Sequence, residues 1–189
     1  MPPKTKITKD MIIDAAFNIV REEGADKINA RNISEKLNCS TQPVLYHFAT
    51  IDEIREETYK KADIYHSEYI TNIRKENNTL LTPGILYIRF AQDEKELFRF
   101  LFQSDKFAKK SLKELIDQEE IKPVLENMQK MTSATMEETK RIFSSIFLMV
   151  HGYASLIANN AMVYDEKAMT ELLDTTLSAV ASKIKGGRI

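Results

Sequence analysis

The feature that most constrains the fold of this chain is a long segment without acidic or basic side chains. From Ile142 to Tyr164 the sequence contains no Asp, Glu, Lys or Arg. Its first part, 142–158, is apolar around nearly the whole circumference of a helix, and such a helix requires burial on two sides. It is interrupted by residues that a lipid bilayer disfavours, namely Ser144, Ser145, His151, Gly152, Asn159 and Asn160. We therefore interpret it as a helix enclosed between protein surfaces.

The rest of the chain also has helical periodicity, and no stretch alternates as a strand does. Only five Gly and five Pro occur in 189 residues, so turn-forming residues are scarce. The pattern predicts an all-α protein of about nine helices. The longer ones are expected over 8–23, 51–75, 107–131, 134–160 and 165–185, shorter ones follow Asn29 and Ser40, and two more begin at Thr82 and Asp93.

The first 48 residues contain signals for three short helices. Thr8 and Asn29 are N-cap residues for the first and second helices, and Gly24 ends the first. Asn38 stands where a left-handed residue is needed after the second helix. Ser40 is expected to cap the third helix, which has proline in its first turn.

Two short helices joined by a tight turn and braced by a third form a helix-turn-helix. Val44 and Phe48 are four residues apart and are expected to face inward, against Ala16, Ile33 and Leu37. The outward residues of the third helix are then Thr41, Gln42, Pro43, Leu45, Tyr46 and His47.

This outward surface has the chemistry of a DNA-reading surface. Glutamine pairs with adenine, Pro and Leu contact thymine methyl groups, and Tyr and His reach phosphates. The alternative from the residues alone is a small three-helix module with a polar face. Bulk charge does not decide between them, because the formal net charge is −1.

The stretch ITKDMIIDAAFNIVREEGADKINARNISEKLNCSTQPVLYHF resembles the DNA-binding domain of the tetracycline-repressor (TetR) family. The matching marks are Ile-x-x-Ala-Ala, Glu-x-Gly at 22–24, Arg-x-Ile at 31–33 and the closing His47-Phe48. The resemblance is specific over about residues 6–66. It implies a DNA-binding domain at 6–66, with the motif at about 29–48, and a helical ligand-sensing and dimerisation domain at 67–189.

The resemblance also implies roles for individual residues. Thr41, Gln42, Pro43 and Tyr46 would face base edges or the adjacent backbone, and Arg31 would reach the groove or its rim. Asn29, Ser40 and His47 would lie at phosphates. Lys4, Lys6 and Lys9 resemble the family's basic N-terminal arm.

Two positions depart from the family pattern. Leu45 stands where the family usually has Tyr, and Ile51 where it usually has Lys. Two expected phosphate contacts are therefore missing. Each missing contact should flatten the log–log dependence of affinity on salt by about 0.9. We expect this chain to bind DNA more weakly, or to depend more on Tyr46 and the N-terminal arm.

A symmetric dimer is expected because a single helix-turn-helix reads too few base pairs, and such modules act in pairs on palindromic half-sites. In the family, the last two helices form a four-helix bundle with a second copy. The residues assigned to the dimer interface recur at helical spacing and are Ile146, Val150, Tyr153, Ile157, Leu173, Leu177 and Val180. Their alternative role is the core of a single chain.

An effector site is expected among aromatic side chains of the second domain, interleaved with polar residues that orient a ligand. The residues assigned to it are Tyr87, Phe90, Phe98, Phe102, Gln103, Phe147 and His151. Arg89 is a further polar candidate. Each of these has a core or interface role as its alternative, and the family suggests a largely apolar small molecule.

Together these observations predict a cytoplasmic, ligand-responsive repressor that binds a palindromic operator as a homodimer. The resemblance further implies a two-state switch, in which ligand binding shifts the helix at about 51–75 and so changes the spacing of the two reading helices. The alternatives are an activator and a helical adaptor that does not bind DNA. No phosphate loop, His-x-x-x-His pair or Gly-x-Ser-x-Gly elbow occurs, and His66 and Glu68 do not share a helix face, so we expect no enzyme, cofactor or metal site. Cys39 is the only cysteine, which fits a reducing compartment, and the N-terminus does not resemble a secretory signal.

Overall fold

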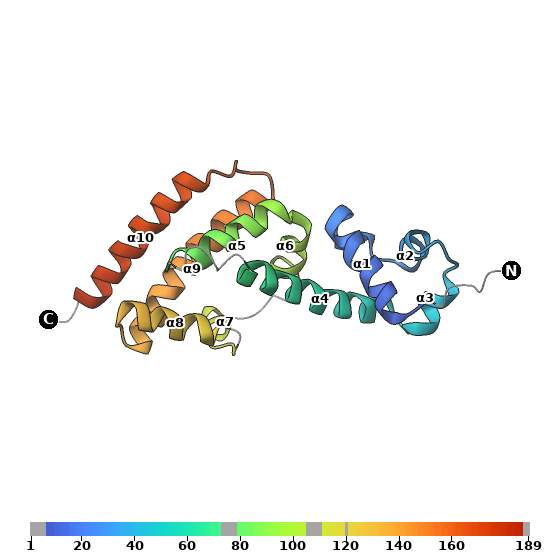
Figure 1. Ribbon diagram of the computed structural model, residues 1–189, viewed down its shortest axis with the longest axis horizontal. Coiled ribbons are helices and arrows are strands. Elements are labelled where there is room, and N and C mark those ends of the chain that lie inside the picture. Colours follow the sequence, from blue (N-terminus) through green and yellow to red (C-terminus); the bar gives the residue numbers. More distant parts are fainter. Residues whose placement is uncertain (1–6, 73–78, 105–110, 120, 187–189) are drawn as a thin grey trace. The chain divides into compact units, whose positions relative to one another are not determined.

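The computed structural model describes residues 7–72, 79–104, 111–119 and 121–186 (Figure 1). Within these ranges the chain forms ten α-helices and one short 3-10 helix, without strands. The predicted all-α class is therefore confirmed. The chain divides into two compact units, and each is described separately below.

The first unit comprises the described residues of 1–68 and 94–106. It contains α1 (Lys9–Glu23), η1 (Ala25–Lys27), α2 (Ala30–Lys36), α3 (Gln42–His47) and α6 (Lys95–Phe102), with most of α4 (Ile51–Asn72). The sequence assigned residues 94–106 to the second domain. In the structure they belong to the first unit, because α6 packs on α1.

Local signals define the ends of the first helices. The Thr8 hydroxyl accepts a hydrogen bond from Met11 N at 3.2 Å, and the side-chain amide oxygen of Asn29 accepts one from Asn32 N at 2.8 Å. Gly24 ends α1 at φ 96°, and Asn38 follows α2 at φ 51°, both in the left-handed region. These four predictions are confirmed.

Helix α3 begins later than the sequence indicated. Ser40 was expected to cap it, but Thr41 occupies the N-cap position and makes no side-chain capping bond. Pro43 in the first turn supplies the start instead, because its ring fixes a helical φ and its missing N–H has no intrahelical partner there.

A continuous apolar core holds the first unit together. The predicted inward residues Val44 and Phe48 are 0% and 5% exposed, and Ile33 is 0% exposed. Leu97 and Leu101 of α6 are also fully buried. Full burial of a side chain of this size contributes about 1.5–3 kcal/mol, so α6 is an integral part of the unit's stability.

A buried carboxylate also fastens α6 to α1 and α4. Glu94 precedes α6 and is 7% exposed. It accepts a bond from Arg21 Nε of α1 at 2.8 Å, a second from Arg21 Nη2, and one from the Tyr65 hydroxyl of α4 at 2.8 Å. The Tyr59 hydroxyl of α4 further donates to Leu101 O at 3.2 Å.

The second unit comprises the described residues of 69–93 and 107–189. It contains the last turn of α4 with α5 (Thr82–Asp93), α7 (Leu112–Ile116), α8 (Lys122–Thr132), α9 (Met136–Ala158) and α10 (Glu166–Gly186). Helix α9 is the centre, since α5, α8 and α10 all pack against it (Figure 1). A Cβ at Gly84 would lie 3.1 Å from Leu173 and 3.3 Å from Val150, so glycine permits α5 to approach both helices closely.

The single helix predicted over 107–131 is wrong in its middle. The structure has α7 ending at Ile116 and α8 beginning at Lys122, with Pro123 in its first turn. Proline removes a backbone donor and clashes with the preceding turn, so a helix cannot continue through it without distortion. This break accounts for ten helices where about nine were expected. Residues 73–75 of the predicted helix 51–75, and 107–110 of this one, lie outside the described residues.

Candidate nucleic-acid interface

Helix α3 has one buried side and one exposed side. Val44 anchors it to the core, whereas Tyr46 is 84% exposed and Leu45 is 59% exposed. Thr41 and Gln42 are exposed beside them, and Pro43 is half-buried. The structure therefore brings together four of the residues expected to face base edges, on a helix whose orientation is determined by its buried side.

The surroundings of this surface contain no carboxylate on the turn or on α3. Residues 36–51 include no Asp or Glu. Arg31, on the neighbouring α2, has a largely exposed side chain that pairs with Glu35 at 2.9 Å. Both members of this pair are exposed to solvent, so phosphate can compete with Glu35 for the guanidinium. A polyanion approaching α3 would meet amide, hydroxyl and aromatic groups on the helix itself, whereas the nearest carboxylates in the sequence, Glu35 of α2 and Asp52 of α4, lie on the flanking helices.

The N-terminal end of the described chain is tied to α3. His47 Nε2 lies 2.9 Å from Ile7 O, and Lys9 Nζ lies 5.3 Å from the centre of the Phe48 ring. Lys9 of the predicted arm is thus placed beside the motif. Lys4 and Lys6 lie outside the described residues. His47 is half-buried and uses one ring nitrogen to hold the backbone.

Two residues expected at phosphates have different settings. The Asn29 side chain is engaged at the start of α2, where it caps Asn32 N and donates to Lys27 O at 3.2 Å. Ser40 is exposed in the turn before α3. In sequence, Asn29 thus lies at the start of α2 and Ser40 in the turn before α3.

The start of α4 is locked by a reciprocal cap that sequence reasoning missed. Thr50 Oγ1 accepts from Glu53 N at 3.2 Å, and Glu53 Oε2 accepts from Ala49 N at 3.0 Å. The Thr-x-x-Glu spacing was the available signal. Ile51, at the first position of α4, is half-buried.

The seven residues assigned to an effector site fall into both units. Phe98, Phe102 and Gln103 belong to the first unit; Phe98 is fully buried, Phe102 is half-buried and Gln103 is exposed. The other four are in the second unit, where Phe90 is fully buried and Tyr87, Phe147 and His151 are half-buried.

Three of the latter form a local cluster between α5 and α9. The Tyr87 hydroxyl lies 2.9 Å from His151 Nδ1, and the Phe147 ring stacks on His151 at 5.6 Å between ring centres. Burial lowers the pKa of His151. Arg89, the further candidate, pairs instead with Glu166 of α10, with Nη2–Oε2 at 2.6 Å. This pair crosses from α5 to α10 and gives Arg89 a structural partner.

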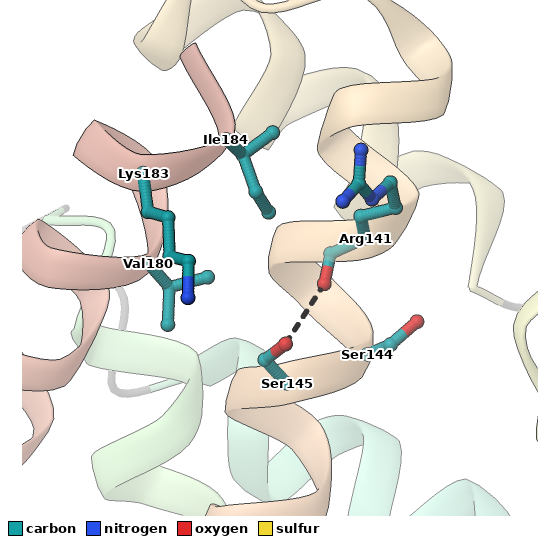
Figure 2. Close-up of a pocket in the computed structure, with 6 residues that line it drawn as sticks. All are labelled: Arg141, Ser144, Ser145, Val180, Lys183 and Ile184. Atoms are coloured by element: carbon teal, nitrogen blue, oxygen red, sulfur yellow. Dashed lines mark hydrogen bonds between the residues drawn. The ribbon is translucent and has the colours of Figure 1, made fainter. Parts of the chain in front are cut away.

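Two surface grooves occur in the second unit, and neither is lined by the seven residues. One, of about 370 Å³, lies between α9 and α10 (Figure 2). The other, of about 520 Å³, lies beside the opposite flank of α10 and includes Leu80, Met131 and Asp174.

The residues assigned to the dimer interface divide by burial. Val150, Ile157, Leu173 and Leu177 are 8% exposed or less within a single chain. They belong to the core of the second unit, the alternative that the sequence left open. Ile146, Tyr153 and Val180 are half-buried and remain at the edge of the core.

An exposed apolar face lies beside this core, and it was not predicted from the sequence. On α9 it consists of Leu148, Gly152 and Leu156, and Leu172 of α10 is 51% exposed. Leu148 and Leu156 are 54% and 43% exposed. The i, i+4, i+8 spacing of 148, 152 and 156 was the signal, but in a segment apolar all round it could not be distinguished from the core stripe. We call these four residues the α9–α10 face.

Two further properties bear on the kind of protein. By length and composition α9 is the one described helix that could cross a membrane, a test that core helices of soluble proteins also pass. Among the residues described, no three His, Cys, Asp or Glu side chains are grouped to hold a metal ion.

Comparison with known proteins adds no relative. No protein-family model matches this sequence, and no curated protein matches it significantly.

Proposed function

We propose that this protein is a DNA-binding transcriptional regulator, a repressor that binds a palindromic operator as a homodimer and is released by a small, largely apolar effector. The proposal rests first on the resemblance of residues 6–66 to the tetracycline-repressor family. The observation that carries it is the exposed side of α3. Tyr46, Leu45 and Gln42 are exposed on a helix whose other side is buried, Lys9 lies beside the end of this helix, and the helix itself carries no carboxylate.

The α9–α10 face supports the dimeric part of the proposal. Large apolar side chains at 43–54% exposure are stabilised when a partner covers them. A two-fold dimer uses the same patch on both subunits and so covers both faces at once. The α9 segment that the sequence required to be buried on two sides then has its second side covered.

The attachment of α6 supports the regulatory part. Helices α4 and α6 are both fastened to α1, through Tyr65, Glu94 and Arg21. Both helices belong to the unit that holds α3, and α4 continues into the second unit. A shift of either helix would therefore displace α1, against which the helix-turn-helix packs. An effector releases DNA only to the extent that it binds the DNA-incompetent spacing of the two α3 helices more tightly.

Selection of binding sites from random duplexes at moderate salt tests the proposal. Wild-type protein is expected to enrich a palindrome. Tyr46→Ala is expected to weaken binding of the selected duplex by about 1–3 kcal/mol, because a base or backbone contact is lost. Its unfolding temperature should not change, since Tyr46 makes little contact with the core.

Ile64→Ala is the matched control, because Ile64 is a large apolar side chain that is 60% exposed on α4, away from α3. It should bind the selected duplex as wild type does. Failure to enrich any sequence, from a protein that is folded and dimeric, would contradict DNA binding and favour a helical adaptor.

A further inference from the structure

We propose that in the homodimer the loop between α9 and α10 of each chain, residues 159–165, fills the groove between α9 and α10 of its partner. This inference rests on the homodimer of the proposed function and adds the register in which the two chains meet. The argument has three parts, which concern the groove, the loop and the symmetry that relates them.

The groove is apolar at its base and cationic at its rim. Val180 and Ile184 of α10 form its half-buried base, and Arg141 and Lys183 stand on either side of it (Figure 2). Neither cation has an ion-pair partner among the described residues. Ser145 donates its hydroxyl proton to Arg141 O at 3.1 Å, which leaves the oxygen lone pairs toward the groove.

The loop presents apolar side chains from an ordered backbone. Ala161 N donates to Leu156 O at 2.9 Å, and the Tyr153 hydroxyl lies 3.4 Å from both Val163 O and Asp165 N. From this frame Val163 projects with 87% exposure and Met162 with 44%. Met162 and Val163 are therefore adjacent exposed apolar side chains that a surface of a second chain can cover.

Symmetry brings these two features together. Helices α9 and α10 form an antiparallel hairpin joined by the loop 159–165 (Figure 1). The groove lies toward the other end of the hairpin, beside Arg141 and Ile184. A two-fold axis can pair the two hairpins in two ways. Like ends meet when loop lies beside loop and groove beside groove, and opposite ends meet when the loop of each chain lies beside the groove of the other. Like ends would place Arg141 and Lys183 of one chain against the same cations of the other, which is repulsive. Opposite ends place the loop of each chain over the groove of its partner.

The spacing along α9 agrees with the second arrangement. With the axis beside Gly152, in the middle of the α9–α10 face, Ser145 lies seven residues before it and Asn159 seven residues after it. At a rise of 1.5 Å per residue both are about 10 Å from the axis, on opposite sides. The loop after Asn159 then reaches the level of the partner's groove.

The chemistry of the two surfaces is complementary in this register. Met162 and Val163 meet the apolar base made by Val180 and Ile184. Asp165, at the end of the loop, uses Oδ1 to accept from Ala168 N at 3.0 Å. In this register its carboxylate would lie at the end of the hairpin where the partner has its rim cations. A cavity that is apolar at its base and cationic at its rim thus receives an apolar loop that ends in a carboxylate.

Cross-linking between two singly substituted chains tests the register. In a Cys39→Ser background, one chain carries Ser145→Cys and the other, with a different tag, carries Val163→Cys. After the chains are unfolded and refolded together, mild oxidation is expected to give a disulfide-linked dimer from the mixture and not from either variant alone. Only a contact between chains can produce this band, because each chain has one cysteine.

Ser178→Cys mixed with Val163→Cys is the matched control, because Ser178 is also exposed but lines the other groove, on the opposite flank of α10. It should cross-link at no more than one tenth of the yield. Sedimentation equilibrium of the uncross-linked variants is measured first. Monomers at all concentrations would overturn the homodimer and the inference together. Dimers in which Ser145 and Val163 do not cross-link above the control would overturn the register alone.

Discussion

A buried imidazole on α4 makes the stability of the first unit depend on pH. The His66 ring packs edge-on against Phe102, with 5.0 Å between ring centres. Burial disfavours the charged imidazolium and lowers the pKa of His66 to about 4, from an ordinary value of 6.5. The unfolded chain therefore binds a proton between pH 6.5 and 4 that the folded chain does not bind.

The resulting prediction concerns the free energy of unfolding. It should fall as the pH is lowered from about 6.5 toward 4, by up to about 3 kcal/mol from this group, at 1.36 kcal/mol per pKa unit. His66→Gln should have a shallower decline over the same range, measured by urea unfolding at several pH values. Equal slopes for the two proteins would show that His66 is not the group responsible.

A second residue-scale prediction concerns Ile51 at the start of α4. Ile51→Lys places a cation where the family usually has one. We expect tighter binding of the selected duplex and a plot of log affinity against log salt that is steeper by about 0.9, because one more phosphate is neutralised. Ile51→Gln is the uncharged control and should leave the slope unchanged. An unchanged slope for the lysine variant would place residue 51 away from the DNA backbone.

At the scale of elements, the junction of α1, α4 and α6 depends on a single carboxylate. Glu94 is nearly buried and neutralises Arg21, whose pKa is raised chiefly by this hydrogen bond. Tyr65, which bonds the same carboxylate, also packs on Phe17, with 5.4 Å between ring centres. Charge, hydrogen bonding and ring packing therefore converge on one point between three helices.

Glu94→Gln should lower the free energy of unfolding by about 1–3 kcal/mol, because the charge-assisted bonds to Arg21 are weakened while the site stays buried. Chemical denaturation followed by circular dichroism measures the change. The control is Glu57→Gln, which removes an exposed pair with Lys60 and should leave the free energy of unfolding nearly unchanged. Equal effects of the two substitutions would indicate that α6 is held by its apolar contacts alone.

Some helix boundaries could be predicted from the sequence, and others could not. Thr8, Gly24, Asn29 and Asn38 act within one turn of helix, so their roles follow from local chemistry. Ser40 was assigned as a cap because its type is favoured there, but Pro43 determined where α3 starts. The same effect of proline at position 123 divides a helix that periodicity alone had made continuous.

The candidate site followed the same division. The exposure of Leu45 and Tyr46 was predicted correctly because Val44 and Phe48 define the opposite side of α3. Pro43 and His47, which were also expected to face outward, are half-buried. The placement of α6 on α1 was not, since it depends on contacts between residues about seventy positions apart, such as Arg21 and Glu94. In α9 the core stripe and the exposed stripe are both apolar, so burial of Val150 and exposure of Leu148 became distinguishable only in three dimensions.

At the scale of the whole molecule, dimerisation and DNA binding are expected to be linked. Leu148→Glu places a carboxylate within the α9–α10 face, where a second copy would bury it without a partner. We expect a monomer by sedimentation equilibrium, and affinity for a palindromic duplex reduced by about 10²-fold or more, because the two half-sites no longer bind as one unit. Ile64→Glu, also at an exposed apolar position, should remain dimeric and bind normally. A dimeric Leu148→Glu protein would place the interface elsewhere.

The route of the chain also affects how the protein is made. The first unit is not contiguous, because α6 is encoded after residues 69–93 of the second unit. On the ribosome, α1, α2 and α3 emerge first. Their apolar core is complete only after Glu94, Leu97 and Leu101 have been synthesised. A fragment that stops at residue 68 would leave the α6-binding surface of α1 bare. The proposed DNA-reading part of this chain is thus not a detachable module, and grafting it onto a different protein domain should succeed only when α6 is transferred with it.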